Sequence, residues 1–291
     1  MTRTTATMLD DVLRVGIQVL LWLWVAINLA TVAWVVLTSL KTTREIFDDP
    51  FGLPAAPMWE NYVTAWNVAG FGGAAASSIV IVSISAVLIV AISAPAAYVL
   101  ARILGRRSER LLTYFAFGMG IPFQLVLIPL FLFSHELDTF MVDWITGWWD
   151  DRITLCLIYV ALSLPFSVFV LASFFRSLPH ELEEAAALDG ASPGAAFWRI
   201  MFPLARPGLV TVLVLNVVSL WNETLLMLVL VTDPAQRTLP GALLNLYNAM
   251  QYTSNWGGLF AGVVILVMPM ILLYMWVGRR IISGMTQGIG K

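Results

Sequence analysis

The residues best suited to chemistry form two groups, and neither group has the pattern of an active site. Glu181, Glu183 and Glu184 bring three carboxylates together in a polar stretch. Carboxylates can act as an acid and base pair, but these begin a predicted helix, where acidic side chains are ordinarily solvated and complement the helix dipole. The second group lies in an apolar segment and consists of Asn216, Ser219, Trp221, Asn222, Glu223 and Thr224.

The sequence lacks the motifs of common enzymes and metal sites. It contains no G-x-S-x-G, H-E-x-x-H or Walker A pattern. Cys156 is the single cysteine and lies in an apolar run, and His135 and His180 are the only two histidines. Neither a disulfide nor a zinc or haem site is therefore expected. Without a phosphate-binding loop the chain cannot hydrolyse ATP by itself, so we expect no enzymatic activity, no metal and no bound cofactor.

The composition indicates that a bilayer is the main solvent of this chain. Of its 291 residues, 59% are hydrophobic and 12% are charged, and the mean hydropathy is +0.85. Soluble domains carry about 25% charged residues. The net charge of −2 comes without a basic cluster, which argues against a nucleic-acid partner. We therefore predict an all-α integral membrane protein.

Six apolar runs set the expected organisation of the chain. Each is close to the ~20 residues that a helix needs to cross ~30 Å of hydrocarbon. The runs lie at about residues 17–40, 79–100, 111–133, 153–175, 209–231 and 258–278. They predict an N-terminal segment 1–16, a six-span domain 17–278 with a polar loop at 176–208, and a tail 279–291.

The loop charges predict the orientation of these spans. Lys and Arg concentrate in cytoplasmic loops. If the N-terminus is inside, the inner segments hold twelve of the sixteen basic residues, namely Arg3, Arg14, Arg102, Arg106, Arg107, Arg110, Arg176, Arg199, Arg206, Arg279, Arg280 and Lys291. Both termini and the 176–208 loop are therefore expected in the cytoplasm.

The polar loop is predicted to contain two short helices. Pro179 suits the first turn of one helix, and Asp189-Gly190 is a typical stop signal. Ser192-Pro193 suits the N-cap and first position of a second helix, which the prolines Pro203 and Pro207 should end. The spacing i, i+3, i+4, i+7 gives this second helix an apolar face of Phe197, Ile200, Met201 and Leu204.

The same loop resembles a known signature. Glu184-Ala185-Ala186, then Gly190, Ile200 and Phe202-Pro203, follow the spacing of the "EAA" loop in membrane subunits of ABC importers. The family usually has Leu where this chain has Phe202, which keeps an apolar residue before the proline. The sequence from Leu178 to Ser192 resembles that of the carbohydrate-uptake branch of the family, in particular the maltose-type permease with six spans.

The resemblance implies a function and a set of partners. The chain would be the permease of a type I importer in the bacterial cytoplasmic membrane, forming the path for a sugar or related polyol-type solute. Its partners would be a second permease, two ATPase subunits that use the ATP, and an extracytoplasmic solute-binding protein. The loop would be the coupling helix seated on the ATPase, and the expected coupling residues are Glu183, Glu184, Ala185, Ala186, Asp189, Gly190, Ile200 and Pro203.

The polar group in the fifth span leaves two interpretations open. Ionisable side chains inside a span ordinarily face the bundle interior or a water-filled path. Asn216 and Glu223 are seven residues apart, so a continuous helix would place them on one face. The run Trp221-Asn222-Glu223 also resembles an element of sugar-importer permeases, which favours Asn216, Ser219, Trp221, Asn222 and Glu223 as candidates for the substrate path. Alternatively, Glu223 caps a helix or pairs with a partner subunit.

One other class of function is compatible with six spans and an intramembrane carboxylate. A stand-alone secondary transporter, driven by a proton or sodium gradient, would need no ATPase subunit. The sequence itself leaves the identity of the solute open, and it also leaves open whether two copies or two homologues form the pore.

Overall fold

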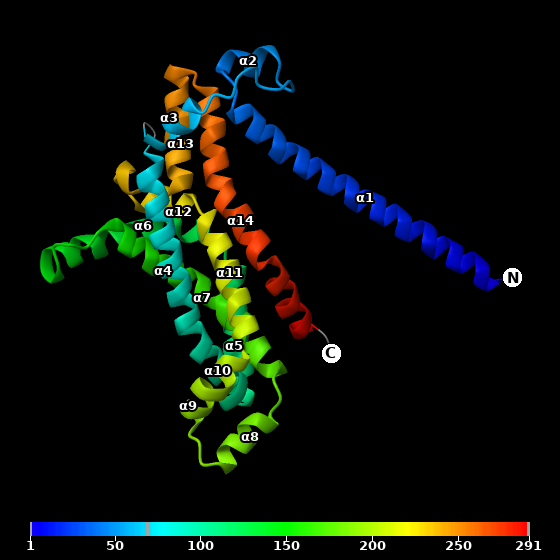
Figure 1. The fold of residues 1–291 in the computed structure, drawn as a ribbon. Helices are drawn as coiled ribbons and strands as arrows, with labels where there is room; N and C mark the ends of the chain where they lie inside the picture. Colours follow the sequence, from blue (N-terminus) through cyan, green and yellow to red (C-terminus); the bar gives the residue numbers. More distant parts are fainter. Residues whose placement is uncertain (1, 68–69, 290–291) are drawn as a thin grey trace. The chain divides into compact units, whose positions relative to one another are not determined.

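The computed structural model describes the backbone of residues 2–67 and 70–289, and these residues form helices, turns and loops without a β-strand (Figure 1). The all-α prediction is confirmed. The long helices are α1 (Thr2–Ser39), α4 (Phe71–Tyr98), α5 (Arg106–Gly120), α6 (Leu127–Phe140), α7 (Asp151–Ser177), α11 (Arg206–Trp221), α13 (Leu239–Thr253) and α14 (Trp256–Ile289).

Shorter helical segments connect them. Before α4 lie α2 (Thr43–Asp48) and α3 (Glu60–Asn67). Single turns of 3₁₀- or π-helix lie at the ends of helices or between them, namely η1 (Val99–Ile103), η2 (Phe123–Val126), η3 (Met141–Ile145), η4 (Phe197–Met201) and η5 (Pro234–Gln236). The polar loop holds α8 (Glu181–Leu188), α9 (Pro193–Ala196) and α10 (Phe202–Leu204), and α12 (Leu225–Leu230) follows α11.

Five of the described helical segments are long and apolar enough to cross a membrane. They are Leu13–Ser39, Phe71–Ile103, Phe123–Ile145, Asp151–Ser177 and Trp256–Trp276. A sixth is possible if Pro193–Leu204 and Arg206–Trp221, which meet at 72°, count as one broken span. The chain is therefore a multi-pass helical protein, and the exact number of spans stays a prediction.

The predicted third span, 111–133, is not one continuous helix. α5 ends at Gly120, and Ile121 is extended, with φ −85° and ψ 114°. Pro122 follows it, and a residue before proline is disfavoured in the α conformation because the proline ring crowds its backbone. The apolar segment of span length is instead Phe123–Ile145.

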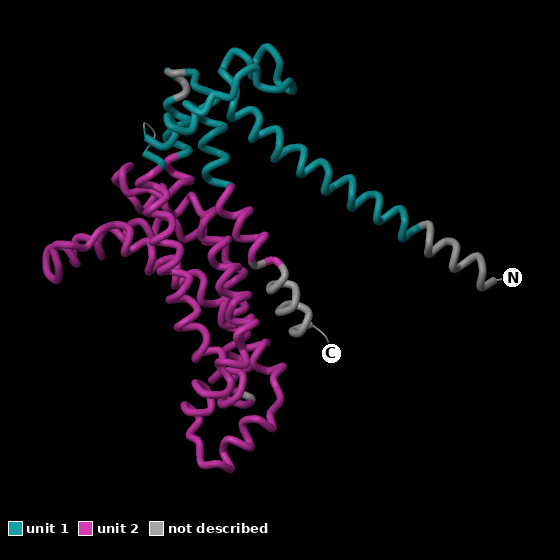
Figure 2. Tube along the Cα trace, in the orientation of Figure 1, with its two compact units in different colours: residues 1–71, 243–267 teal, residues 72–242, 268–291 magenta. Residues whose placement is uncertain are grey.

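The chain forms two compact units, residues 1–71 with 243–267 and residues 72–242 with 268–291 (Figure 2). In the first unit the Lys41 side chain is buried, and its Nζ donates to the Asp49 carbonyl oxygen at 2.9 Å. Thr42 and Glu45 form a capping box at the start of α2, and the hydrogen bond from the Thr42 backbone N–H lowers the pKa of Glu45. Local capping and a buried lysine thus order the segment after α1.

The core of the second unit lies where α4, α5, α7 and α11 pack together. Leu171 and Phe175 of α7 are buried there, together with Val212 of α11. At Gly208 a Cβ atom would lie 2.6 Å from the Phe174 ring, so a glycine is needed where α11 approaches α7 this closely. The start of α11, and with it the end of the polar loop, is thereby held against α7.

Candidate functional site

Helix α8 ends as the sequence predicts. Gly190 has a φ of +80°, a conformation that favours glycine. The Ala191 N–H donates to the Ala186 carbonyl oxygen at 2.9 Å, and the Gly190 N–H donates to that of Ala187 at 3.0 Å. These two bonds form a Schellman motif, which satisfies carbonyls at the end of the helix. Pro179, by contrast, precedes the N-cap residue His180 and lies outside the first turn.

The second loop helix begins as predicted but does not end at Pro203. The Ser192 hydroxyl accepts from the Ala195 N–H at 3.3 Å, and Pro193 occupies the first turn. The helix then widens into the π-turn η4, whose last bond runs from the Phe202 N–H to the Phe197 carbonyl. This shift places Pro203 in the first turn of α10, where its missing N–H costs little. The chain bends only after Leu204.

Most of the predicted apolar face of this second helix is buried. Phe197 packs in the core with Tyr98, at 5.0 Å between ring centroids, and Met201 is fully buried. Ile200 packs at the edge of the same cluster. Leu204, the fourth residue of this face, is exposed where the chain bends toward α11.

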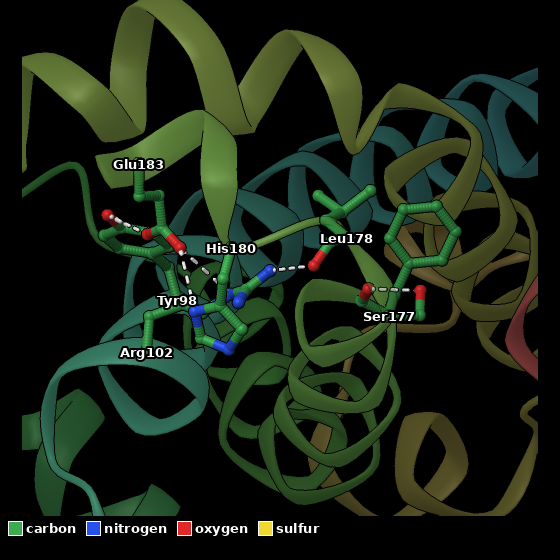
Figure 3. A network of polar contacts seen from close by, with 7 residues as sticks. Tyr98, Arg102, Ser177, Leu178, His180 and Glu183 are labelled. Atoms are coloured by element: carbon green, nitrogen blue, oxygen red, sulfur yellow. Dashed lines mark hydrogen bonds and ion pairs between the residues drawn. The ribbon is translucent and has the colours of Figure 1, made fainter. Parts of the chain in front are cut away.

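Glu183 is tied to the end of α4 through a set of contacts that we call the Arg102 network (Figure 3). The Tyr98 hydroxyl donates to Glu183 Oε1 at 2.8 Å, and Arg102 Nε lies 3.3 Å from Glu183 Oε2. A second nitrogen of Arg102, Nη2, donates to the Leu178 carbonyl oxygen. His180 Nδ1 lies 3.9 Å from Glu183 Oε2. One carboxylate of α8 thus meets a tyrosine and an arginine that precede it by about eighty residues.

The two faces of α8 have different environments. Ala186 is buried and the Glu183 side chain is only 18% exposed, so the face that carries them lies against the protein. The opposite face is exposed and contains Glu181, Glu184, Ala185 and Leu188, which we call the α8 stripe. Leu188, at 90% exposure, is the most exposed of the predicted helix's apolar residues. Of the predicted coupling residues, Glu184, Ala185, Asp189 and Gly190 are exposed, whereas Glu183, Ala186, Ile200 and Pro203 are partly or fully buried.

Tyr98, Arg102 and Leu188 were not predicted as site residues. Arg102 is one of the twelve basic residues of the predicted inner segments, and nothing in the local pattern pairs it with Glu183. Leu188 did carry a signal. It follows Glu181, Glu184 and Ala185 at helical spacing, so a helical projection would have placed this leucine on the solvated side.

The polar residues of the fifth span do not form one site. α11 ends at Trp221, so Asn216 and Glu223 do not share a continuous helical face, and the predicted span 209–231 is interrupted at residues 222–224. Asn216 is buried, and its Nδ2 donates to Ser167 Oγ at 2.9 Å, which joins α11 to α7. Trp221 is buried, whereas Ser219 and Asn222 are exposed.

Glu223 caps the next helix. Its Oε1 accepts from the Leu226 N–H at 2.8 Å, and its Oε2 accepts from the Met227 N–H at 3.2 Å. The Tyr159 hydroxyl of α7 donates to the same Oε2 at 2.7 Å. These contacts favour the helix-capping interpretation of Glu223, because its carboxylate satisfies the free N–H groups at the start of α12.

A cleft of about 400 Å³, lined by both polar and apolar side chains, was not predicted from the sequence. His135, Asp138 and Asp143 line it from α6 and η3, and Asp151 and Thr232 from the segments beside them. Asp151 Oδ2 accepts from the Thr232 hydroxyl at 2.7 Å. Among the described residues no group of three or more His, Cys, Asp or Glu side chains is arranged to hold a metal ion.

Comparisons with known proteins agree with the predicted family. Residues 93–287 match the family described as "Binding-protein-dependent transport system inner membrane component". The chain is 39% identical to the diacetylchitobiose uptake system permease protein NgcG of Streptomyces coelicolor, over 92% of this chain and 86% of that protein. It is 34% identical to the trehalose transport system permease protein SugB of Mycobacterium tuberculosis, over 90% of this chain and 92% of that protein.

A solved structure has the same fold. It is a chain of a bacterial ABC transporter involved in the import of the acidic polysaccharide alginate, with a TM-score of 0.75 over 96% of this chain and 98% of that chain, at 22% identity. The architecture is therefore the type I ABC importer permease fold. From the family match, the two relatives and this fold together, we conclude that the chain belongs to the binding-protein-dependent transport system inner membrane components and is a permease of an ABC importer for sugar-type solutes.

Proposed function

We propose that the α8 stripe is the surface that docks on the ATPase subunit of the importer. The observation that carries this proposal is the exposure of Leu188 on a helix whose other face is held by the protein itself. A fully exposed leucine leaves apolar area in water, and covering it with a partner is favourable by about 25 cal/mol per Å². The small side chain of Ala185 beside it lets a partner approach closely.

This proposal divides the predicted coupling residues by role. Glu184, Ala185 and Leu188 contact the ATPase subunit directly. Glu183, Ala186, Ile200 and Pro203 support the loop from within, and Asp189-Gly190 ends α8 so that the stripe has a defined length. ATP is bound and used by the partner, and this chain binds no cofactor of its own.

A cysteine cross-link tests the docking. In a Cys156→Ser background, Leu188→Cys labelled with a maleimide-linked benzophenone is expected to photo-cross-link to the ATPase subunit in the assembled importer. Ala235→Cys is the matched control, because Ala235 is also exposed but lies in a segment predicted on the outer side. Cross-linking at both positions, or at neither, would contradict docking through the α8 stripe.

We further infer that the chain crosses the bacterial cytoplasmic membrane six times with both termini inside. The concentration of Arg and Lys in the predicted inner segments supports this orientation. A second permease, two ATPase subunits and an extracytoplasmic binding protein complete the complex. Affinity purification in mild detergent, followed by mass spectrometry, tests this composition. Recovery of the chain alone would favour the alternative of a secondary transporter, in which Glu223 would have to release its capping contacts to carry an ion.

The solute is proposed to be a sugar of two or more units. Relatives named for diacetylchitobiose, trehalose and starch degradation products are 39%, 34% and 30% identical to this chain. Uptake of labelled diacetylchitobiose and trehalose by cells with and without the gene tests this class. Loss of uptake only for a monosaccharide would overturn it.

A further inference from the structure

The Arg102 network joins the proposed docking helix to a helix that is not its neighbour in the chain. α8 is connected covalently to α7 through residues 178–180 and to α9 through residues 189–192, and both connections are non-helical. Connections of this kind can bend, so they would pass on only part of any movement of α8. The third connection is through side chains, from Glu183 to Tyr98 and Arg102 near the end of α4 (Figure 3).

Arg102 is well placed to hold both parts of the loop. Its side chain is only 2% exposed, and a buried guanidinium needs a compensating charge. Among the described residues, Glu183 is the carboxylate within ion-pair distance of it. The same guanidinium donates through Nη2 to the carbonyl of Leu178, in the segment that leads into α8. One side chain of the η1 turn therefore holds the helix and the segment before it.

The surroundings of Arg102 make this contact hard to replace. Its Nη1 and Nε atoms are both buried without a hydrogen-bond partner among the described residues, so the contact of Nε with Glu183 is an ion pair. Arg102 thus has no spare acceptor to turn to if Glu183 moves away. Tyr98 is fixed independently, because its ring packs on Phe175 and Phe197 at 5.7 Å and 5.0 Å between centroids. The network therefore has a rigid base on the core side.

We propose that Tyr98 and Arg102 are positioning residues. Through the hydrogen bond and the ion pair that they form with Glu183, they make α8 and the end of α4 move as one body. This inference rests on the proposed docking of the α8 stripe. Glu184 projects to the exposed face, where it meets the ATPase subunit, while Glu183 transmits the movement inward. Two adjacent glutamates thus divide docking and transmission between them.

The test measures solute transported per ATP hydrolysed by the complete importer in proteoliposomes. Glu183→Gln removes the charge that Arg102 needs, and it is expected to lower this ratio about three- to tenfold, the range typical of residues that couple two sites. Glu109→Gln is the matched control, because Glu109 is exposed and lies outside both the α8 stripe and the Arg102 network. It is expected to keep the ratio unchanged.

A covalent replacement separates transmission from folding. With Cys156→Ser, the double variant Arg102→Cys/Glu183→Cys is expected to show the low ratio. A bifunctional methanethiosulfonate linker of suitable length should restore the ratio, and a reductant should abolish the restoration. Tyr98→Phe removes a single hydroxyl and is expected to lower the ratio about twofold.

The outcomes distinguish this inference from the docking proposal. Cross-linking through Leu188→Cys is measured in the same preparations. If it persists and Glu183→Gln keeps the parental ratio, transmission through Glu183 is wrong while docking stands. If Glu183→Gln loses the ATPase subunit, or if the linker leaves the ratio low, the positioning role is also wrong. Absence of the Leu188→Cys cross-link in the otherwise unmodified chain would refute the docking itself.

Discussion

Helix α8 and the start of helix α12 both place a carboxylate against a distant helix, but only α8 leaves one face open. Glu223 accepts from Tyr159 and from two backbone N–H groups, and its helix is largely buried. Glu183 accepts from Tyr98 and forms an ion pair with Arg102, yet the opposite face of its helix is exposed and includes Leu188. A polar group whose contacts are complete stabilises the fold. The exposed Leu188 is the position that we propose the ATPase subunit covers.

Substitution of Gly190 should have the largest effect. Gly190→Pro is incompatible with a φ of +80° and removes the N–H that donates to Ala187, so α8 should lose its end. We expect solute uptake to fall more than about tenfold, with membrane insertion intact, because a misdirected loop forfeits an interaction energy of more than about 1.4 kcal/mol. Gly194→Ala is the control, since Gly194 has no positive φ and no atom near its Cβ position. Parental uptake by Gly190→Pro would show that the turn does not orient the docking surface.

Leu188→Asp should weaken docking of the ATPase subunit on the exposed face of α8 without affecting the fold. The substitution places a charge where apolar contact with the ATPase subunit is proposed, and retention of that subunit should weaken about tenfold. The unfolding temperature of the isolated chain should stay the same, because Leu188 is exposed. Thermal unfolding and pull-down of the ATPase subunit measure the two effects. A fall in unfolding temperature with normal pull-down would assign Leu188 to the fold instead.

Glu223→Leu should have the opposite effect, lowering the stability of the fold without affecting docking of the ATPase subunit. It leaves two N–H groups of α12 and the Tyr159 hydroxyl without their acceptor, so the free energy of unfolding should fall by about 2 kcal/mol. Retention of the ATPase subunit should be unchanged. Glu223→Gln keeps one oxygen acceptor and should lose less. If Glu223→Leu were as stable as the parent but transported no solute, Glu223 would belong to the substrate path.

The smallest effect is expected at Asp150, whose cap of α7 is compared with the two carboxylates above. Asp150 caps α7, and the hydrogen bond from the Arg152 side chain lowers the pKa of its carboxyl. A lowered folded-state pKa gives stability that is present above the unfolded pKa and is lost as the pH falls through the folded pKa. Between pH 5 and 3 the parent should therefore lose up to about 1 kcal/mol more than Asp150→Asn. Equal acid sensitivity of the two chains would show that this cap contributes nothing.

Interruptions of the apolar segments were predicted less well than the segments themselves. Hydropathy identified the long apolar runs, because burial in lipid depends on composition over about twenty residues. It did not locate the two breaks, where α5 ends before Ile121-Pro122 and α11 ends at Trp221. The expectation that Asn216 and Glu223 share a face failed for this reason.

The class of the protein, the resemblance of its loop and the helix boundaries at Gly190 and Ser192 could be predicted from the sequence alone. The Gly190 turn and the Ser192 cap were readable because each depends on atoms within a few residues. Which face of α8 packs against the protein and which face is exposed depends on the tertiary structure. That choice depends on Tyr98 and Arg102, which are about eighty residues away from Glu183 and meet it only after α4, α7 and the loop have packed together.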